Sequence, residues 1–283
     1  MKYSKAIMLS AVLLAPCAPA QADDGWRFGL NSGITLYSGD DDPRFASIHA
    51  ARDFEQGYIQ LGISIIDGAV NQGIVAAVPV NTETVTLAGG RSFGDFSFDG
   101  YASVGQRQFK PKTLPGGRVT VNTDGSSFAI GGALTYDVQL SDSVSIAPFA
   151  ALDYDKVDVG RFIILPSGEA RTVKSKEDGV TASAGASLQK MFGAEQAHSI
   201  AITTAFVATS NSSSTRSGTG ANATGRIVAA RNVSAQSDEW AELGASASFA
   251  IAEKLRLNLN ANRTLGFAGL EATTVAVGLS LRF

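Results

Sequence analysis

The amino-acid sequence predicts an all-β protein, a single closed antiparallel transmembrane β-barrel of about twelve strands. Three observations predict this fold class. Large apolar residues alternate with small or polar ones at a period of two, over segments of 9 to 16 residues. Tight turns and long polar connections alternate along the chain, as in outer-membrane barrels with short periplasmic turns and longer extracellular loops. The chain ends on an aromatic residue, Phe283, that closes the last apolar face.

Residues 1–22 are predicted to be a cleaved signal peptide. Lys2 and Lys5 precede a short apolar run over 6–15, and Ala20-Gln21-Ala22 supplies small residues for cleavage. The run is too short for a spanning helix, which needs about 20 residues. The remaining residues, 23–283, are assigned to one barrel domain in the outer membrane of a Gram-negative cell.

The single cysteine, Cys17, lies inside this predicted signal. Residues 14–17 resemble a lipoprotein signal, an alternative that Pro16 disfavours. In either case no disulfide is available to residues 23–283. That part has 21 Lys and Arg against 26 Asp and Glu, which argues against nucleic-acid binding. With 45% hydrophobic and 17% charged residues, disorder is also excluded.

Twelve segments in order carry the alternation. The clearest has Phe128, Ile130 and Leu134 on one face, and the last has Val275, Val277 and Leu279. Ten or fourteen strands remain alternatives. The predicted strands are 25–37, 45–54, 58–66, 74–88, 93–104, 126–140, 144–157, 178–192, 199–209, 238–251, 255–262 and 271–283.

Two strands fit the pattern poorly. In 45–54, Arg52 shares a face with Ile48 and Phe54. In 238–251, Trp240 lies on the opposite parity from Leu243 and the apolar residues after it, which indicates a bulge or a later start.

The connections are predicted to differ between the two ends. Residues 141–143 and 252–254 are tight turns, whereas 105–125, 159–176 and 210–236 are long external loops. The stretch Gly89-Gly90-Arg91-Ser92-Phe93-Gly94 resembles a phosphate loop, but we interpret it as a hairpin turn.

Aromatic residues are expected at strand ends, as in the aromatic girdles of membrane barrels. Trp26, Phe192 and Phe283 fall near the predicted periplasmic ends, and Tyr37 and Phe128 near the outer ends. A soluble sandwich, the alternative fold, would bury aromatic residues in its core instead.

The inward face is predicted to be small and polar, which indicates a wet interior in a barrel of this size. Five charges are expected to line it and to set ion selectivity if the barrel is a pore: Arg52, Asp137, Asp153, Arg256 and Arg282.

No catalytic residue, cofactor or metal ligand is predicted. His49 with Asp53 offers a weak hydrolase alternative, and His198 lies in a predicted turn. No G-x-S-x-G or P-loop motif occurs. Asp40-Asp41-Asp42 could hold calcium, but a solvated turn closed by Pro43 is favoured.

A basic loop offers a contact with lipid. Arg107, Lys110, Lys112 and Arg118 occur in a segment whose only acid is Asp124. Such groups can pair with lipopolysaccharide phosphates, although ordinary solubilising charge is the alternative. Outer-membrane lipid and lipopolysaccharide are therefore expected partners.

Residues 145–154, 179–192 and 275–283 resemble the translocator barrel of autotransporters (type V secretion), and the likeness extends over about 101–283. The resemblance implies twelve strands and export of an N-terminal passenger, with a helix in the barrel. Only two residues separate Ala22 from Gly25, so a free-standing form without a passenger is expected. The implied role is non-enzymatic, translocator-like or structural; a porin-like channel for small solutes is the alternative.

The last strand carries an expected assembly signal. Leu279, Leu281 and Phe283 alternate up to the C-terminus and resemble the signal read by the outer-membrane assembly machinery, an expected partner. An exposed last strand can be captured by edge pairing. Phe283 can equally serve as an interfacial anchor.

Overall fold

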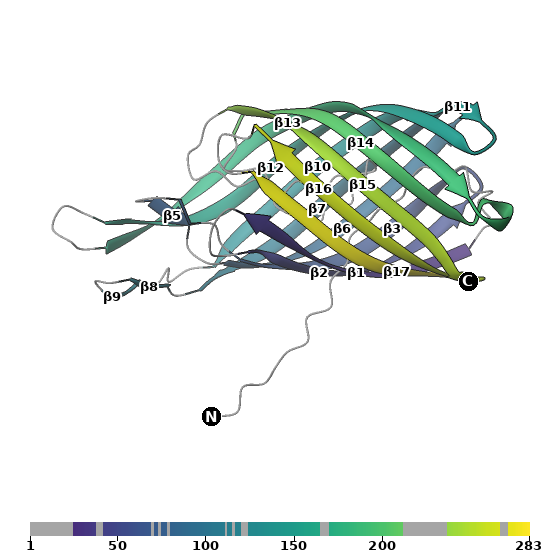
Figure 1. Ribbon diagram of the computed structural model, residues 1–283. Coiled ribbons are helices and arrows are strands. Elements are labelled where there is room, and N and C mark those ends of the chain that lie inside the picture. Colours follow the sequence, from purple (N-terminus) through teal and green to yellow (C-terminus); the bar gives the residue numbers. More distant parts are fainter. Residues whose placement is uncertain are drawn as a thin grey trace.

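A computed structural model describes residues 25–37, 42–68, 71–72, 75–77, 80–110, 112–114, 117–119, 124–164, 170–211, 237–266 and 271–283. Twelve long strands form one barrel (Figure 1). They are β1 (Gly25–Tyr37), β2 (Arg44–Phe54), β3 (Gly57–Gly68), β6 (Val80–Phe93), β7 (Phe96–Phe109), β10 (Gly125–Tyr136), β12 (Val144–Ile164), β13 (Ala170–Phe192), β14 (His198–Thr209), β15 (Asp238–Ala252), β16 (Leu255–Leu265) and β17 (Ala272–Arg282).

The sheet closes on itself, which confirms the predicted fold class and strand number. Each strand pairs antiparallel with its neighbours in chain order, and β1 pairs with β17. At this closure the Phe283 amide donates to the Trp26 carbonyl over 2.8 Å. Closure matters because an open sheet edge would leave unpaired backbone groups in lipid.

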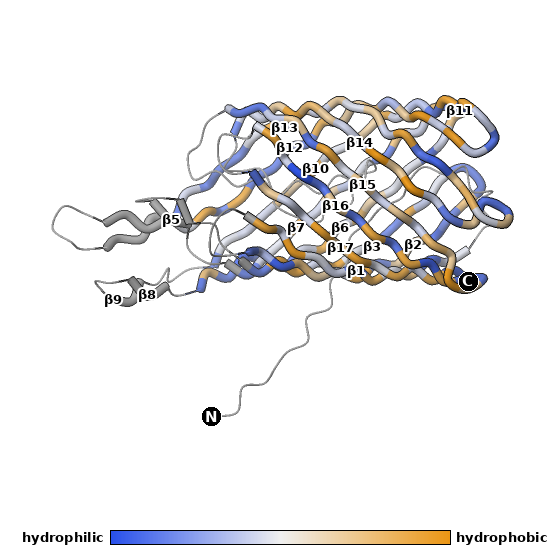
Figure 2. Tube along the Cα trace, in the orientation of Figure 1, coloured by the Kyte–Doolittle hydropathy of each residue, from blue (hydrophilic) through white to orange (hydrophobic). Residues whose placement is uncertain are grey.

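The pleat gives the wall two unlike faces, visible as alternating colours along the strands in Figure 2. Large apolar side chains point out: Leu87 is 56% exposed and Leu152 59%. Polar side chains point in: Thr274 is 1% exposed and Ser103 2%. A soluble sandwich would show the reverse, so this inside-out pattern excludes that alternative.

The outer face of β13 gives the height of the apolar band. Between Lys190 and Asp178 every outward residue is apolar: Leu188, Ala186, Ala184, Ala182 and Val180. Twelve residues of a strand tilted by about 45° rise about 28 Å, close to the band of about 25 Å expected for a membrane barrel. Among the described residues, no helix is long and apolar enough to span a membrane.

The two ends of the barrel differ. At one end, here the turn end, short connections such as Glu55-Gln56 and Gly94-Asp95 join the strands, and the C-terminus lies there (Figure 1). At the other, the loop end, lie β4 (Asn71–Gln72), β5 (Val75–Ala77), β8 (Lys112–Leu114) and β9 (Gly117–Val119). Beside the turn end, β11 (Val138–Ser141) continues β10, and the 3₁₀ turn η1 (Ala194–Gln196) joins β13 to β14.

Two predicted external loops are largely strand. In the segment 159–176, the described residues 159–164 and 170–176 belong to β12 and β13, which pair continuously from Val144↔Lys190 to Ile164↔Ala170. Likewise β7 extends to Phe109 instead of ending at 104. Strand pairing continues above the apolar band, where both faces of a strand can be polar and no alternation marks it. Of 210–236, only Ser210 and Asn211 are among the described residues.

The predicted hairpin turn at 89–94 is wrong. Gly89 to Phe93 belong to β6, whose predicted range was 74–88, and the turn is formed by Gly94, with φ of 63°, and Asp95. Gly90 serves close packing instead of turn geometry, because a Cβ there would lie 2.1 Å from Asp99 Oδ1.

The two strands that fit poorly pair regularly through Trp240 and Arg52. Trp240 is 2% exposed and faces inward, where its Nε1 donates to Glu242 Oε1 over 2.9 Å. The β14–β15 register runs unbroken through Trp240, so neither the bulge nor the later start predicted for this region occurs. In β2, Ile48 and Phe54 face outward together with Arg52, whose guanidinium stacks on Trp26 at 5.9 Å.

Candidate functional site: the interior of the barrel

The interior is lined by hydroxyl, amide and small side chains from all twelve strands. This follows from the alternation, since each strand sends every second residue inward. Buried inward residues include Asn31, Ser64, Thr84, Ser103, Ser127, Thr135, Ser183, Gln189, Ser199, Thr209, Asn260 and Thr274. Pairs of buried hydroxyl groups also join neighbouring strands, for example Thr35 with Thr274 at 3.0 Å and Thr181 with Thr209 at 3.0 Å.

Arginines gather on the strands that close the barrel, β16, β17, β1 and β2, here called the seam wall. Asp53 accepts from Arg27 Nη2 at 3.1 Å and from Arg282 Nη2 at 3.4 Å. Arg256 is held apart from Asp53: its Nε donates to Ser248 Oγ over 3.1 Å and its Nη2 to the Ala197 carbonyl over 2.9 Å. Near the turn end, Asp53 therefore pairs with two guanidinium groups, and neutral oxygens accept from the third, that of Arg256.

The strands β7, β10, β12 and β13 are here called the far wall, and β7, β12 and β13 carry carboxylates that point inward. Tyr58 on β3 donates to Asp99 Oδ1 over 2.8 Å, and Tyr101 donates to Asp153 Oδ1 over 2.9 Å. In both pairs the tyrosine and the carboxylate are two strands apart and meet over a glycine of the strand between, Gly90 or Gly131.

The glycines make these pairs possible. A Cβ on Gly131 would lie 2.0 Å from Asp153 Oδ1 and 2.8 Å from the Tyr101 ring. Asp155 and Glu177 add further buried carboxylates to the same wall, and Glu177 accepts from Ser175 Oγ at 2.8 Å. The far wall thus carries mainly carboxylates, together with Arg107 of β7, and tyrosine hydroxyls donate to two of these carboxylates.

Strand order places the two walls opposite each other. In the ring of twelve, β10 is six strands from β17 in either direction. The arginines lie on and beside β17, and Asp99 and Asp153 lie on the two neighbours of β10. The interior is therefore polarised across its width.

The predicted set of interior charges is partly right. Asp153, Arg256 and Arg282 face inward, whereas Arg52 faces outward, because it follows the parity of Ile48. Asp137 is half-buried between β10 and β11, where its amide donates to the Asp95 carbonyl. Burial raises the pKa of Asp137 above its ordinary value, and the Asp95 carboxylate adds to the rise.

The histidines lie in unlike surroundings. His49 is buried on β2, and its ring covers Gly29, while the carboxylate of Asp53 is held by Arg27 and Arg282. The pairing of His49 with Asp53 on which the hydrolase alternative depended is thus replaced by ion pairs. His198 begins β14, accepts from the Ala250 amide and contacts Phe192. In the described ranges no group of three His, Cys, Asp or Glu residues is placed to hold a metal, and Asp40 and Asp41 lie outside them.

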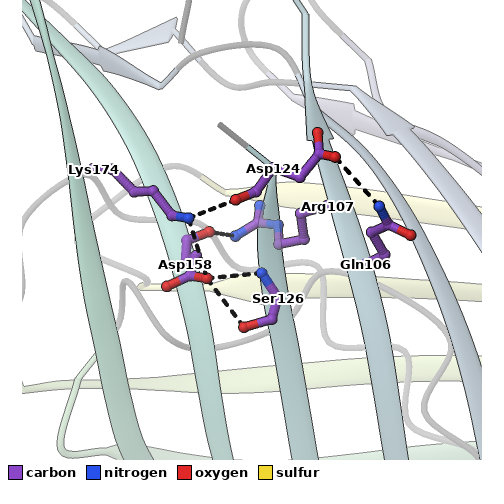
Figure 3. Close-up of polar contacts among 6 residues, drawn as sticks. All are labelled: Gln106, Arg107, Asp124, Ser126, Asp158 and Lys174. Carbon is purple, nitrogen blue, oxygen red and sulfur yellow. Dashed lines mark hydrogen bonds and ion pairs between the residues drawn. The ribbon is translucent and has the colours of Figure 1, made fainter. Parts of the chain in front are cut away.

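The predicted basic loop does not form one cluster. Arg107 belongs to β7, faces inward and donates to the Asp158 carbonyl (Figure 3). Lys110 pairs with Asp67 of β3 at 2.5 Å. Lys112 and Arg118 belong to the separate β8–β9 hairpin.

The residues of the expected assembly signal lie on the outer face. Leu279, Leu281 and Phe283 are 41%, 36% and 63% exposed. The Phe283 ring meets Phe28 edge to face at 5.8 Å, and Phe28 stacks on Trp26. The three aromatic residues form a cluster at the turn end of the closure, which agrees with the predicted interfacial positions of Trp26 and Phe283.

Sequence reasoning missed the Tyr58–Asp99 and Tyr101–Asp153 pairs, which join residues 41 and 52 positions apart. No local spacing marks such pairs. A search for a tyrosine and a carboxylate that both have inward parity, two strands apart, with an inward glycine on the strand between them, could have found these pairs.

A protein-family model for the autotransporter beta-domain matches residues 67–262. No curated protein sequence matches the chain. Among solved structures, the translocator domain of the autotransporter NalP from Neisseria meningitidis aligns with a TM-score of 0.67 at 11% identity. This alignment covers 94% of this chain and 91% of that one. The beta domain of the Bordetella autotransporter BrkA aligns at 0.61 with 13% identity, covering 91% and 98%.

An outer-membrane channel from Pseudomonas putida F1 is also similar, with a TM-score of 0.55 at 8% identity and coverage of 96% and 100%. These likenesses show a shared barrel fold. The family match extends over more than half of the chain and includes the far wall, whereas of the seam wall it reaches only β16. The twelve-stranded barrel, with the outer-membrane location that this fold implies, thus belongs to the autotransporter β-domain family.

Proposed function

We propose that the barrel forms a water-containing, translocator-like passage across the outer membrane, with its turn end toward the periplasm. The observation that carries this is the polarised interior: hydroxyl and amide side chains throughout, arginines on the seam wall and carboxylates on the far wall. Charged groups on the inside of a membrane barrel point to contact with water or polar solutes.

Conductance tests this proposal. The refolded barrel, checked by heat-modifiable migration on gels, is added to a planar lipid bilayer. Steady channels are expected. Silence from correctly folded protein would contradict a water-containing passage and would point to a filled interior.

We also propose that the barrel is not an enzyme. Asp53, the one carboxylate that sequence reasoning placed near a histidine, is occupied by two arginines. The family match and the similar solved structures support a transport role. Hydrolysis of a lipid or peptide ester by the refolded protein, abolished by His49→Ala, would contradict this proposal.

A channel for small solutes is the second candidate function. Arg282 favours it, since its side chain is 42% exposed beside the mouth of the turn end, where an anionic solute can reach it. Uptake of small charged solutes into vesicles that contain the barrel would support this function. Uptake no faster than in empty vesicles, despite measured conductance, would favour the translocator role.

Leu279, Leu281 and Phe283 are proposed as the signal for the assembly machinery. Support comes from their outward positions on β17 and from the backbone bonds between Phe283 and Trp26, which complete the closure last in chain order. Deleting Phe283 should reduce the membrane-inserted fraction in cells while the purified chain still refolds in detergent. Normal insertion without Phe283 would contradict the signal. Removal of residues 1–22 stays a prediction, and N-terminal sequencing of the membrane form should begin at Asp23.

A further inference from the structure

Three lysines lie together on the outer surface of the β12–β13 hairpin, just above the apolar band. They are Lys156, Lys174 and Lys176, here called the lysine patch. The register pairs Lys156 with Asp178, Asp158 with Lys176 and Gly160 with Lys174. Since outward residues alternate along each strand, all three lysines leave the wall on the side that faces the membrane.

The height of the patch places it at the lipid headgroups. Val180, Tyr154 and Phe128 are the last outward apolar positions of β13, β12 and β10 below it. Lys156 is opposite Phe128 in the register and is the next outward residue after Tyr154. Tyrosine and lysine at the edge of an apolar band are typical of the zone where headgroups begin.

Asp158 holds the patch against the wall and leaves most of its positive charge exposed. Its Oδ2 accepts from the Ser126 amide at 2.8 Å and from Ser126 Oγ at 3.0 Å (Figure 3). Lys174 Nζ lies 3.6 Å from the same oxygen and donates to the Asp124 carbonyl over 2.5 Å. The Asp158 side chain is 6% exposed, whereas Lys156 and Lys176 are exposed, so the surface shows mainly the ammonium groups and the exposed Asp178.

We propose that the lysine patch binds the phosphate groups of lipopolysaccharide in the outer leaflet. Lysine binds phosphate as a point charge, and cationic side chains near a lipid surface gain about 1 kcal/mol each from anionic headgroups. On adjacent strands, separated by about 4.8 Å, Lys156 and Lys176 can converge on one phosphate-bearing headgroup beside Lys174, which Asp158 and Asp124 hold in place. Tyr154 and Phe128 below them supply apolar contacts for its acyl chains.

This site replaces the predicted basic loop. The expected ligand is the same, but the lysines that bind it lie on the barrel wall. The sequence placed these lysines in the strand 144–157 and in the loop 159–176. Binding there depends on the outer-membrane location of the barrel and is independent of whether the interior conducts.

The test is binding of purified lipopolysaccharide to the folded full-length barrel in phosphatidylcholine nanodiscs. The variant K156Q/K174Q/K176Q should bind about tenfold more weakly or worse. The matched control R91Q/K190Q/K254Q removes three exposed cations near the turn end and should bind as the wild type does. Because Lys174 also supports Asp124 and Asp158, the variant K156Q/K176Q serves as a second test that keeps those contacts.

Lipid chemistry completes the test. Lipopolysaccharide stripped of its phosphates should bind the wild type and the triple variant equally weakly. Equal losses in the triple variant and the control would overturn the proposal, because net charge alone would then explain them. Equally tight binding of phosphatidylglycerol would overturn the assignment to lipopolysaccharide. Heat-modifiable migration of every variant confirms that the barrel is folded.

Discussion

The seam wall and the far wall are built from the same kind of strand, yet they hold their interior charges by different means. On the seam wall, Asp53 bridges Arg27 and Arg282 and so ties β2 to β1 and β17. On the far wall, tyrosine hydroxyls hold Asp99 and Asp153 over glycines. The closure therefore depends on ion pairs, whereas the far wall depends on hydrogen bonds from tyrosine hydroxyls and on close packing.

This difference indicates which carboxylates contribute most to the free energy of unfolding. Removing a carboxylate from between two cations leaves charge that has lost its counterion, a large cost when the cations are partly buried. Removing charge from a carboxylate that accepts from a neutral hydroxyl costs less, since an amide oxygen can accept the same bond.

The largest expected effect comes from Asp53→Asn. We expect the free energy of unfolding to fall by about 2 kcal/mol; partial exposure of Arg27 and Arg282 keeps the loss below that of a fully buried pair. Asp99→Asn should cost about 0.5 kcal/mol, because Tyr58 keeps an acceptor. Urea unfolding of the refolded barrel in vesicles measures both. Equal losses would break the distinction between the walls.

Gly131→Ala should cost about 1–2 kcal/mol, through crowding of Asp153 and the Tyr101 ring. Gly62→Ala on β3 is the matched control, since the nearest atom to its Cβ would be the Ile48 carbonyl oxygen at 3.5 Å, an ordinary contact. The same urea unfolding series applies. A control variant as unstable as Gly131→Ala would mean that any added methyl group is harmful and that the tyrosine–carboxylate pair is not special.

Asp137, at the turn end beside the far wall, should give the smallest effect. Its raised pKa means that the folded state holds this proton more tightly than the unfolded chain does, so ionisation costs stability as pH rises. Asp137→Asn should therefore stabilise the barrel at pH 7 by about 0.3 kcal/mol, a value reduced for partial solvent exposure. The gain should vanish by about pH 3. Unfolding midpoints across this pH range measure it, and a gain independent of pH would contradict the assignment.

Much of the barrel could be predicted from the sequence, because the alternation that marks a membrane strand lies within that strand. Inside the apolar band every outward residue must suit lipid, so the alternation at Phe128, Ile130 and Leu134 marks the strand and its faces. Beyond the band that constraint ends. The paired residues 159–164 and 170–176 therefore resemble a loop in sequence although they are strand.

The interior was less predictable, since its contacts depend on register between distant strands. Parity alone placed Asp153, Arg256 and Arg282 inside, but it could not pair Tyr101 with Asp153 or Arg282 with Asp53 across 229 positions. The misplacement of Arg52 has a different origin: the residue was assigned inward because it is charged, although its parity was outward. Stacking on Trp26 at the membrane edge makes the outward position tolerable.

The most direct test of the account is the ion selectivity of the channel when each wall loses two charges. R256Q/R282Q neutralises two cations of the seam wall and leaves the Arg27–Asp53 pair. D99N/D153N neutralises two carboxylates of the far wall and leaves the tyrosine bonds. Reversal potentials in a salt gradient should shift in opposite directions, toward cations for the first variant and toward anions for the second. Shifts in the same direction, or no shift in either variant of a conducting barrel, would contradict a passage lined by two opposed walls.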